Sequence, residues 1–350
     1  MRQLIPKDRI TDDNRPFIIA EIGSNHMGSV EVCKQLIKIA ANCGADAVKL
    51  QKRNNEAMFT KAQLQQPYVN DNSLGPTYGE HRGKLDWFSN AEYADFIALA
   101  DKLGIMFFAT AFDEPSADFL ASFDIPAFKI ASSDVRNIPL LQYVAGFGKP
   151  MIISTGGCYL DDIKRAHDAL HAVNFTDFAF LHCVATYPNQ DDELNLRVIG
   201  QLMDIFKHHV IGFSTHHPGI MPLILAYTEG ARIFEVHITT NRALGGTDHA
   251  FSFEPRGFER VCEDLKRINA MLGDGVKRLL DREKGGFTYK FGKAVHIVRP
   301  VEAGQPLRRE DVSLKAPASG LPPWELEGVI GKIAVCDLST ADILGWEKVR

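Results

Sequence analysis

Eight short runs of β-branched, aromatic and other apolar residues recur along the chain, and a longer stretch of helical character separates each run from the next. Two of these stretches, residues 29–43 and 90–103, are followed by Gly44 and Gly104, which can adopt the left-handed conformation that ends a helix. Alternating strands and helices indicate a parallel sheet covered by helices. The eight runs are 17–23, 47–52, 106–112, 127–132, 150–156, 178–184, 210–216 and 232–239.

Eight strand and helix units over about 250 residues are typical of a closed (β/α)8 barrel. An open, doubly wound sheet is the alternative. However, the first run leads into Gly23-Ser24-Asn25-His26-Met27-Gly28, which is not the Gly-x-Gly-x-x-Gly turn of a dinucleotide-binding sheet. We therefore predict an α/β fold with a TIM barrel in residues 1–283.

The sequence changes in character after the barrel. Short strand-like runs at 294–298 and 329–336 are broken by turn sequences at 302–305 and 320–323. This pattern predicts a small β-rich domain in residues 284–350. A chain of 350 residues is long enough for one barrel and such a domain.

Composition and charge exclude several classes of protein. The net charge of −5 argues against nucleic acid as a partner. No segment is apolar for long enough to span a membrane, and residues 1–9 lack the apolar run of a signal peptide, so we expect a cytoplasmic protein. The cysteines stand singly and are interpreted as reduced thiols. They are Cys33, Cys43, Cys158, Cys183, Cys262 and Cys336.

Two lysines, Lys49 and Lys129, lie inside otherwise apolar strands. A buried ammonium group is costly without an anionic partner. One interpretation pairs these lysines with Glu21 or Glu235 in structural salt bridges. The interpretation we favour is that the lysines bind a phosphate or carboxylate, because hydroxyl donors lie near the carboxyl ends of neighbouring strands, where barrel active sites form. These donors are Thr110, Ser132, Ser154 and Ser214.

His216 and His237 end neighbouring strands, so their imidazoles can meet above the barrel and bind a divalent metal. A histidine pair can equally be hydrogen-bonded in a core. The carboxylates of Glu21, Glu235 and Asp248 favour metal binding, because oxygen ligands suit Mn²⁺ and similar ions.

The remaining polar candidates would bind the hydroxyls of a polyhydroxylated substrate, with loop capping as the alternative for Asp134 and Tyr187. They are Gln51, Asp134, Tyr187 and Asp248. Other histidines are interpreted as supporting residues or are assigned no role. His26, His182 and His217 form the first group, and His167, His171, His208 and His209 form the second.

Several segments resemble the N-acetylneuraminate (sialic acid) synthase family, in the same order along the chain. The resemblance rests on residues 17–28, 48–51, 128–132, 148–156, 181–183, 187–188 and 246–255. The sequence from Phe291 onward resembles the antifreeze-like (SAF) domain that follows the barrel in this family.

The resemblance implies a reaction in which phosphoenolpyruvate condenses with an N-acylated aminohexose and phosphate is released. It implies catalytic roles for Glu21, Lys49, Lys129 and Asp248. It also implies a divalent metal on His216 and His237, with Mn²⁺ expected and Mg²⁺ or Co²⁺ as alternatives. A domain-swapped homodimer, in which one chain's SAF domain covers the other's barrel, follows from the same resemblance. Lys49, Thr110, Lys129, Ser132, Ser154 and Ser214 would bind phosphoenolpyruvate, and Gln51, Asp134, Tyr187 and Asp248 the sugar.

Two positions depart from the family pattern. Ala185 stands where relatives have a small polar residue near phosphoenolpyruvate, and Ala316 stands where they often have an arginine that reaches the sugar's N-acyl group. A synthase of the legionaminic or pseudaminic type, acting on a diacylated dideoxyhexose, is therefore an alternative. A metal-dependent aldolase or lyase is another. An ice-binding or carbohydrate-binding protein with an inert barrel would leave Lys49 and Lys129 unexplained.

Overall fold

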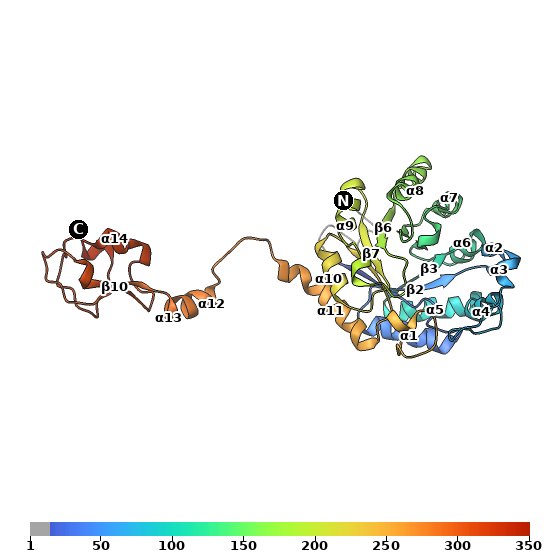
Figure 1. Ribbon diagram of the computed structural model, residues 1–350, viewed down its shortest axis with the longest axis horizontal. Coiled ribbons are helices and arrows are strands. Elements are labelled where there is room, and N and C mark those ends of the chain that lie inside the picture. The colour runs from blue at the N-terminus through green and yellow to red at the C-terminus, as the bar shows by residue number, and fades with distance from the viewer. Residues whose placement is uncertain (1–14) are drawn as a thin grey trace. The chain divides into compact units, whose positions relative to one another are not determined.

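The computed structural model describes residues 15–350, so the N-terminal residues in which we expected no signal peptide lie outside the described part. The chain forms two compact units, of which the first ends at Leu272 and the second begins at Gly273 (Figure 1). The boundary predicted between residues 283 and 284 falls inside the second unit, in a helical segment that precedes the core of that unit.

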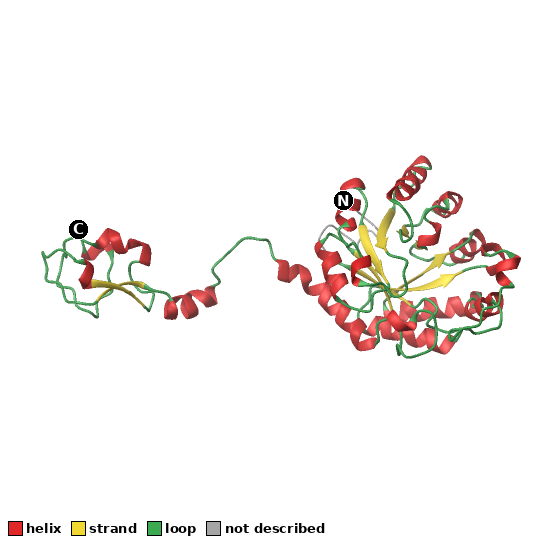
Figure 2. Cartoon of the chain, in the orientation of Figure 1, coloured by secondary structure: helices red, strands yellow, loops and turns green. Residues whose placement is uncertain are grey.

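The first unit is a closed barrel of eight parallel strands in sequence order, with the last strand paired to the first. Figure 2 shows strands of this unit with helices around them. The predicted (β/α)8 barrel is confirmed, and the open sheet is excluded. Most strands end before the predicted runs do, because residues such as Ser132 already belong to the following turn. The strands are β1 (Phe17–Glu21), β2 (Ala47–Lys52), β3 (Met106–Ala111), β4 (Phe128–Ile130), β5 (Met151–Ser154), β6 (Phe178–Cys183), β7 (Ile211–Thr215) and β8 (Ile233–His237).

Helices connect the strands, and both predicted helices form. Helix α1 starts where the Ser29 side chain accepts a hydrogen bond from the backbone of Val32, and α5 ends at Gly104, which has a φ of 69°. The helical elements of this unit are α1 (Val30–Asn42), α2 (Asn55–Met58), α3 (Lys61–Leu64), α4 (Tyr78–Leu85), α5 (Asn90–Leu103), α6 (Glu114–Ala121), η1 (Ser132–Asp134), α7 (Ile138–Ala145), α8 (Leu160–Ala172), η2 (Asp191–Glu193), α9 (Val198–Ile205), α10 (Met221–Thr228), η3 (His249–Phe251) and α11 (Pro255–Leu272).

The barrel interior is apolar at one end and polar at the other. Side chains alternate along each strand, so Ile18 and Ala20 pack in the cluster under the helices, while Phe17 and Ile19 belong to a second cluster inside the barrel. Gly212 makes room there, since a Cβ atom at this position would lie 2.4 Å from Leu181 Cδ2. Continuing the alternation beyond this apolar layer brings polar side chains to the carboxyl ends of the strands.

The second unit contains the antiparallel pair β9 (Ala294–Ile297) and β10 (Val312–Lys315) over its own apolar core. The strand predicted at 329–336 is wrong. The helix α14 (Leu326–Val329) ends there, Gly331 turns the chain with a φ of 84°, and only isolated bridges follow. The other elements are α12 (Asp281–Glu283), the π-helix η4 (Lys284–Thr288), α13 (Tyr289–Phe291), η5 (Arg309–Asp311), η6 (Pro323–Glu325) and η7 (Trp346–Lys348).

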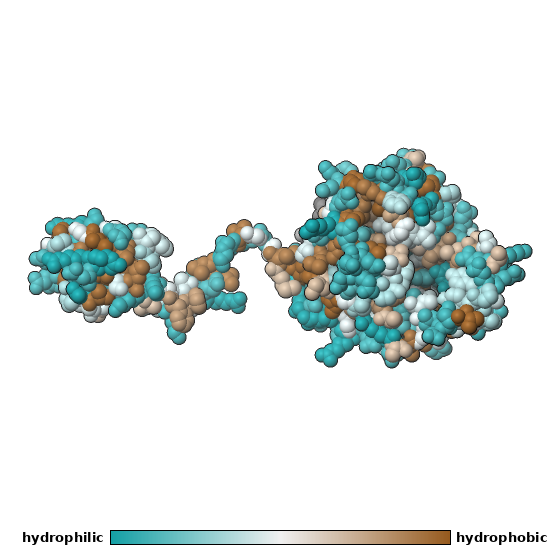
Figure 3. Space-filling view, viewed as in Figure 1, coloured by the Kyte–Doolittle hydropathy of each residue, from teal (hydrophilic) through white to brown (hydrophobic). Residues whose placement is uncertain are grey.

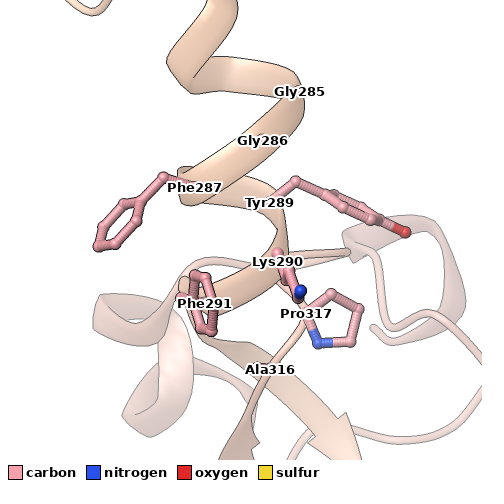
Figure 4. A pocket seen from close by; sticks show the side chains of 8 residues that line it. All are labelled: Gly285, Gly286, Phe287, Tyr289, Lys290, Phe291, Ala316 and Pro317. Carbon is pink, nitrogen blue, oxygen red and sulfur yellow. The ribbon is translucent and has the colours of Figure 1, made fainter.

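The segment that precedes β9 exposes large apolar side chains, and much of it is coloured hydrophobic in Figure 3. Phe287, Tyr289 and Phe291 line a pocket there together with Ala316 and Pro317 (Figure 4). The position that departs from the family pattern, Ala316, therefore lies beside an aromatic cluster. None of the helices within residues 15–350 combines the length and the apolar character that crossing a membrane requires.

Candidate active site

The two strand lysines lie buried at the carboxyl ends of the barrel strands, each 2% exposed. Lys49 Nζ on β2 lies 2.7 Å from Glu21 Oε2 on β1 and donates a 2.7 Å hydrogen bond to Thr110 Oγ1 on β3. Lys129 Nζ on β4 donates to Ser154 Oγ on β5 at 2.6 Å and to its neighbour's carbonyl oxygen at 2.8 Å. Each lysine thus contacts a hydroxyl on the next strand, as expected if both charges face one site.

Glu235 on β8 connects the two lysines. Its Oε2 atom lies 3.8 Å from Lys129 Nζ and 4.0 Å from Lys49 Nζ, and its Oε1 atom accepts a hydrogen bond from Ser214 Oγ at 3.1 Å. Burial alone would raise the pKa of Glu235, but the charges of Lys129 and Lys49 lower it overall, so this carboxylate is ionised. The sequence left two interpretations of the lysines, structural salt bridges and hydroxyl donors around an anion. The salt bridges and the hydroxyl donors are both present in this cluster.

Ser132 and Ala185 lie at one side of this cluster. Ser132 Oγ accepts a 2.9 Å hydrogen bond from the backbone nitrogen of Gly156, after β5. A Cβ atom at Gly156 would lie 3.0 Å from Ser132 Oγ and 3.2 Å from the Ala185 methyl group. Ala185 is therefore close to Ser132, and it offers a methyl group rather than a hydrogen-bond donor.

The histidine pair lies at the carboxyl ends of β7 and β8. The ring centroids of His216 and His237 are 5.4 Å apart, and both rings pack edge-on against Phe251. His216 Nδ1 lies 3.1 Å from the carbonyl oxygen of Val184, and donation to that oxygen leaves Nε2 with a free lone pair. His237 Nδ1 is buried and has no hydrogen-bond partner among residues 15–350.

These histidines fit a divalent metal. Burial, with a contribution from His237, lowers the pKa of His216 to about 4, so its imidazole is neutral near pH 7. Asp248 adds a carboxylate beside the pair: a Cβ atom at Gly23 would lie 2.7 Å from Asp248 Oδ2 and 3.1 Å from His237 Cε1. Ser24 fixes this carboxylate through its backbone nitrogen at 2.9 Å. Two imidazoles beside a carboxylate suit Mn²⁺ or a related ion, with water or substrate completing the coordination.

Three of the four sugar-binding candidates surround the lysines and histidines. Gln51 Nε2 donates to Glu21 Oε1 at 2.8 Å, and Asp248 lies beside His237. The Tyr187 ring is 4.0 Å from the His216 ring and 60% exposed, so it can contact a ligand.

The fourth candidate, Asp134, lies in a different environment. It accepts hydrogen bonds from Ser133 Oγ at 2.9 Å and Asn137 Nδ2 at 3.1 Å, and it lines a separate pocket with Asp113 and Met58. This is the loop-capping arrangement that was the alternative for Asp134.

Two supporting residues escaped the sequence analysis. Arg53 donates to Gln51 Oε1 at 2.6 Å and pairs with Asp86 at 3.2 Å. Its position two residues after Gln51, immediately after the end of β2, was a usable signal. Asn189 accepts hydrogen bonds from the His216 backbone nitrogen at 2.8 Å and from Thr215 Oγ1 at 3.3 Å. No periodicity connects these residues.

Known proteins are similar in sequence to almost the whole chain. The NeuB family model matches residues 36–277, and the SAF domain model matches residues 292–350. The N-acetylneuraminate-9-phosphate synthase of Mus musculus is 35% identical, covering 95% of this chain and 92% of that protein. The N,N'-diacetyllegionaminic acid synthase of Legionella pneumophila is 32% identical, covering 95% and 94%.

A solved structure is similar to this chain as well. The crystal structure of N-acetylneuraminic acid (sialic acid) synthetase from Leptospira borgpetersenii has a TM-score of 0.71 and 31% identity, covering 83% of this chain and 96% of that chain. The chain therefore belongs to the NeuB family, the sialic acid synthases, and is an enzyme of this phosphoenolpyruvate-dependent class with a C-terminal SAF domain.

Proposed function

We propose that the protein condenses phosphoenolpyruvate with an N-acylated aminohexose, such as N-acetylmannosamine, to form a sialic-acid-type nonulosonic acid. C3 of phosphoenolpyruvate attacks the aldehyde carbon of the open-chain sugar, water adds at C2, and the C2–O bond to phosphate breaks. The observation that carries the proposal is the cluster of Lys49, Lys129 and their hydroxyl partners beside the His216 and His237 pair.

In this proposal the lysine cluster binds phosphoenolpyruvate. The ammonium groups of Lys49 and Lys129 stabilise the negative charge of the phosphate and carboxylate groups, because oriented charges inside a water-poor site need no reorganisation during reaction. The neighbouring hydroxyls complete the hydrogen bonds to the anion. These hydroxyls belong to Thr110, Ser132, Ser154 and Ser214.

The histidine pair and its surroundings bind the sugar side of the reaction. A divalent ion on His216 and His237, which we expect to be Mn²⁺, would act as a Lewis acid on the sugar aldehyde. Gln51, Tyr187 and Asp248 would orient the sugar through its hydroxyl groups, and Asp134 would contribute only if its loop turned toward the substrate. Orientation of the two substrates supplies much of the rate, since it makes the carbon–carbon bond formation intramolecular in effect.

Glu21 is the residue that we assign to the attacking water. Its two oxygens contact Lys49 at 2.7 Å and Gln51 at 2.8 Å, so the carboxylate is held between the two substrate sites. We assign it the positioning or deprotonation of the water that attacks C2, at the stage when phosphate leaves.

We also propose that the enzyme discriminates less strictly, or differently, between the groups that a sugar can carry at C2. Ala316 has no charge or donor that could replace the bidentate arginine expected there. Relatives in the same identity range are named as synthases of both N-acetylneuraminate 9-phosphate and N,N'-diacetyllegionaminic acid. A diacylated dideoxyhexose, as in legionaminic- or pseudaminic-type synthesis, is therefore the second candidate substrate. For assembly, we propose a domain-swapped homodimer, which the exposed aromatic segment before β9 supports.

The test is incubation of the full-length protein with phosphoenolpyruvate, Mn²⁺ and a panel of hexosamines, with phosphate release and product mass measured. A condensing synthase releases one phosphate for each product molecule. A metal-dependent aldolase or lyase on the same barrel would release none. A preference for N-acetylmannosamine above roughly a hundredfold in kcat/KM, about 2.7 kcal/mol of discrimination, would contradict the relaxed selection.

A further inference from the structure

Three histidines gather at the end of the barrel opposite the active site. His167 and His171 are four residues apart on α8, which places them on one face of the helix with ring centroids 4.2 Å apart. His209 lies just before β7, whereas His216 follows the carboxyl end of the same strand. The three residues therefore lie near the amino-terminal ends of the strands, away from His216 and His237.

The geometry of this cluster suits a transition metal. Each of the three residues offers one nitrogen ligand atom, and these atoms all lie within 4.8 Å of one another. His171 Nε2 and His209 Nε2 are 3.3 Å apart. Two imidazole nitrogens bound tetrahedrally to Zn²⁺, at bond lengths of about 2.0–2.1 Å, are separated by about 3.3 Å. These two nitrogens share a hydrogen bond in the structure without an ion, and their separation equals that of two ligands on one ion.

Hydrogen bonds orient two of the imidazoles for binding. His209 Nδ1 lies 3.0 Å from the carbonyl oxygen of Phe178, and His167 Nδ1 lies 2.9 Å from Asp168 Oδ1. Donation through Nδ1 leaves Nε2 as the acceptor nitrogen, and in His209 it accepts a hydrogen bond from His171 Nε2 that a bound ion would replace. A carbonyl or carboxylate acceptor behind a histidine is the usual second layer of a metal site. The His209 ring is further fixed by stacking on Phe178, at 4.0 Å between centroids.

The surroundings of the cluster give an ion a route to the ligands. His209 is 4% exposed while His171 is open to solvent, so an ion can enter from the surface and reach a buried ligand.

We propose that His167, His171 and His209 form a second metal site, for Zn²⁺ or a similar borderline ion, which links α8 to the chain that enters β7. Three imidazoles with water as the fourth ligand match the tetrahedral preference of Zn²⁺. The site is separate from the histidine pair of the proposed reaction and uses none of its residues. Metal bound to the folded state alone would raise the thermal stability of the barrel.

The experiment counts metal equivalents on the full-length protein. Chelator-treated wild type should bind two equivalents of Co²⁺ or Zn²⁺ by calorimetry, and Co²⁺ should give the visible absorption of a tetrahedral site. His171→Ala should bind one equivalent fewer, lose this absorption and the Zn²⁺-dependent rise in Tm, and keep synthase activity with Mn²⁺. His167→Ala should behave in the same way, which guards against a folding defect in one variant.

His208→Ala is the matched control, because this exposed histidine is adjacent to His209 but outside the cluster. It should bind as wild type does. The proposal is overturned if His171→Ala and wild type bind equal amounts, or if His237→Ala abolishes all binding. The difference of one equivalent between wild type and His171→Ala does not depend on whether His216 and His237 bind an ion or the synthase reaction occurs, so the two proposals fail separately.

Discussion

Replacing Lys129 by methionine tests whether the buried lysines bind an anion or only hold the barrel together. Methionine keeps most of the apolar stem and removes the ammonium group. That group makes hydrogen bonds of 2.6 and 2.8 Å and lies 3.8 Å from Glu235. If phosphoenolpyruvate binds at this ammonium group, the affinity of the protein for phosphoenolpyruvate must fall sharply in Lys129→Met.

The expected loss of affinity follows from the burial of the ammonium group. Truncating one partner of a buried, hydrogen-bonded charge contact costs about 2–5 kcal/mol, which is about 30- to 4,000-fold in Kd. The same change leaves Glu235 with one cation fewer and lowers the free energy of unfolding, since an uncompensated buried charge is costly. Affinity and stability therefore have to be measured separately.

Titration calorimetry with phosphoenolpyruvate and urea unfolding provide the two measurements. Lys149→Met is the control, because Lys149 forms a surface ion pair with the exposed Asp124 and should change neither quantity measurably. If Lys129→Met loses stability but binds phosphoenolpyruvate as tightly as Lys149→Met does, the lysine is structural and the assignment of the anion site is refuted.

Three further outcomes are expected. Chelation should abolish activity and Mn²⁺ should restore it, whereas His237→Ala should stay folded and inactive; full turnover in excess chelator would contradict the metal assignment. Removing residues 284–350 should leave the circular dichroism of the barrel intact but impair turnover, and a truncated protein with normal kcat would show the SAF domain to be dispensable. Burial lowers the pKa of His26 to about 4, so the unfolded state takes up a proton first as pH falls from about 6.5 to 4. The free energy of unfolding should drop by up to about 3 kcal/mol over this range, and His26→Asn should reduce the drop. If urea titrations give the variant the same dependence of this free energy on pH as wild type, the role of His26 is refuted.

The barrel was predictable because its signals are local. Each strand is a short apolar run, and Ser29, Gly44 and Gly104 mark helix ends that appear where expected. The convergence of the polar residues followed from topology, since carboxyl ends of parallel strands meet at one end of a barrel. The second unit was less predictable because the apolar run at 329–336 is interrupted by the turn at Gly331. The isolated bridges that follow do not produce the alternation of side chains by which a strand is predicted.

Other features depend on contacts between distant residues. Asn189 supports His216 through its backbone, 27 positions away, and His209 meets His171 across 38 positions. Such pairs have no pattern within one sequence window, so Asn189 was missed and the three-histidine cluster was assigned no role. Asp134 shows the opposite case: its position after β4 suggested a substrate contact, but two local hydrogen bonds hold it in a turn.

The lysine cluster explains why sequence alone left two interpretations open. Glu21 and Glu235 balance the charges of Lys49 and Lys129, so the structure without ligand is electrically satisfied. An entering anion would upset that balance, because both carboxylates would repel it. Binding then requires the hydroxyl donors to offset the repulsion, and a cation on the neighbouring histidine pair would offset it further. In the proposed function, the salt bridges and the anion site are thus two states of one cluster.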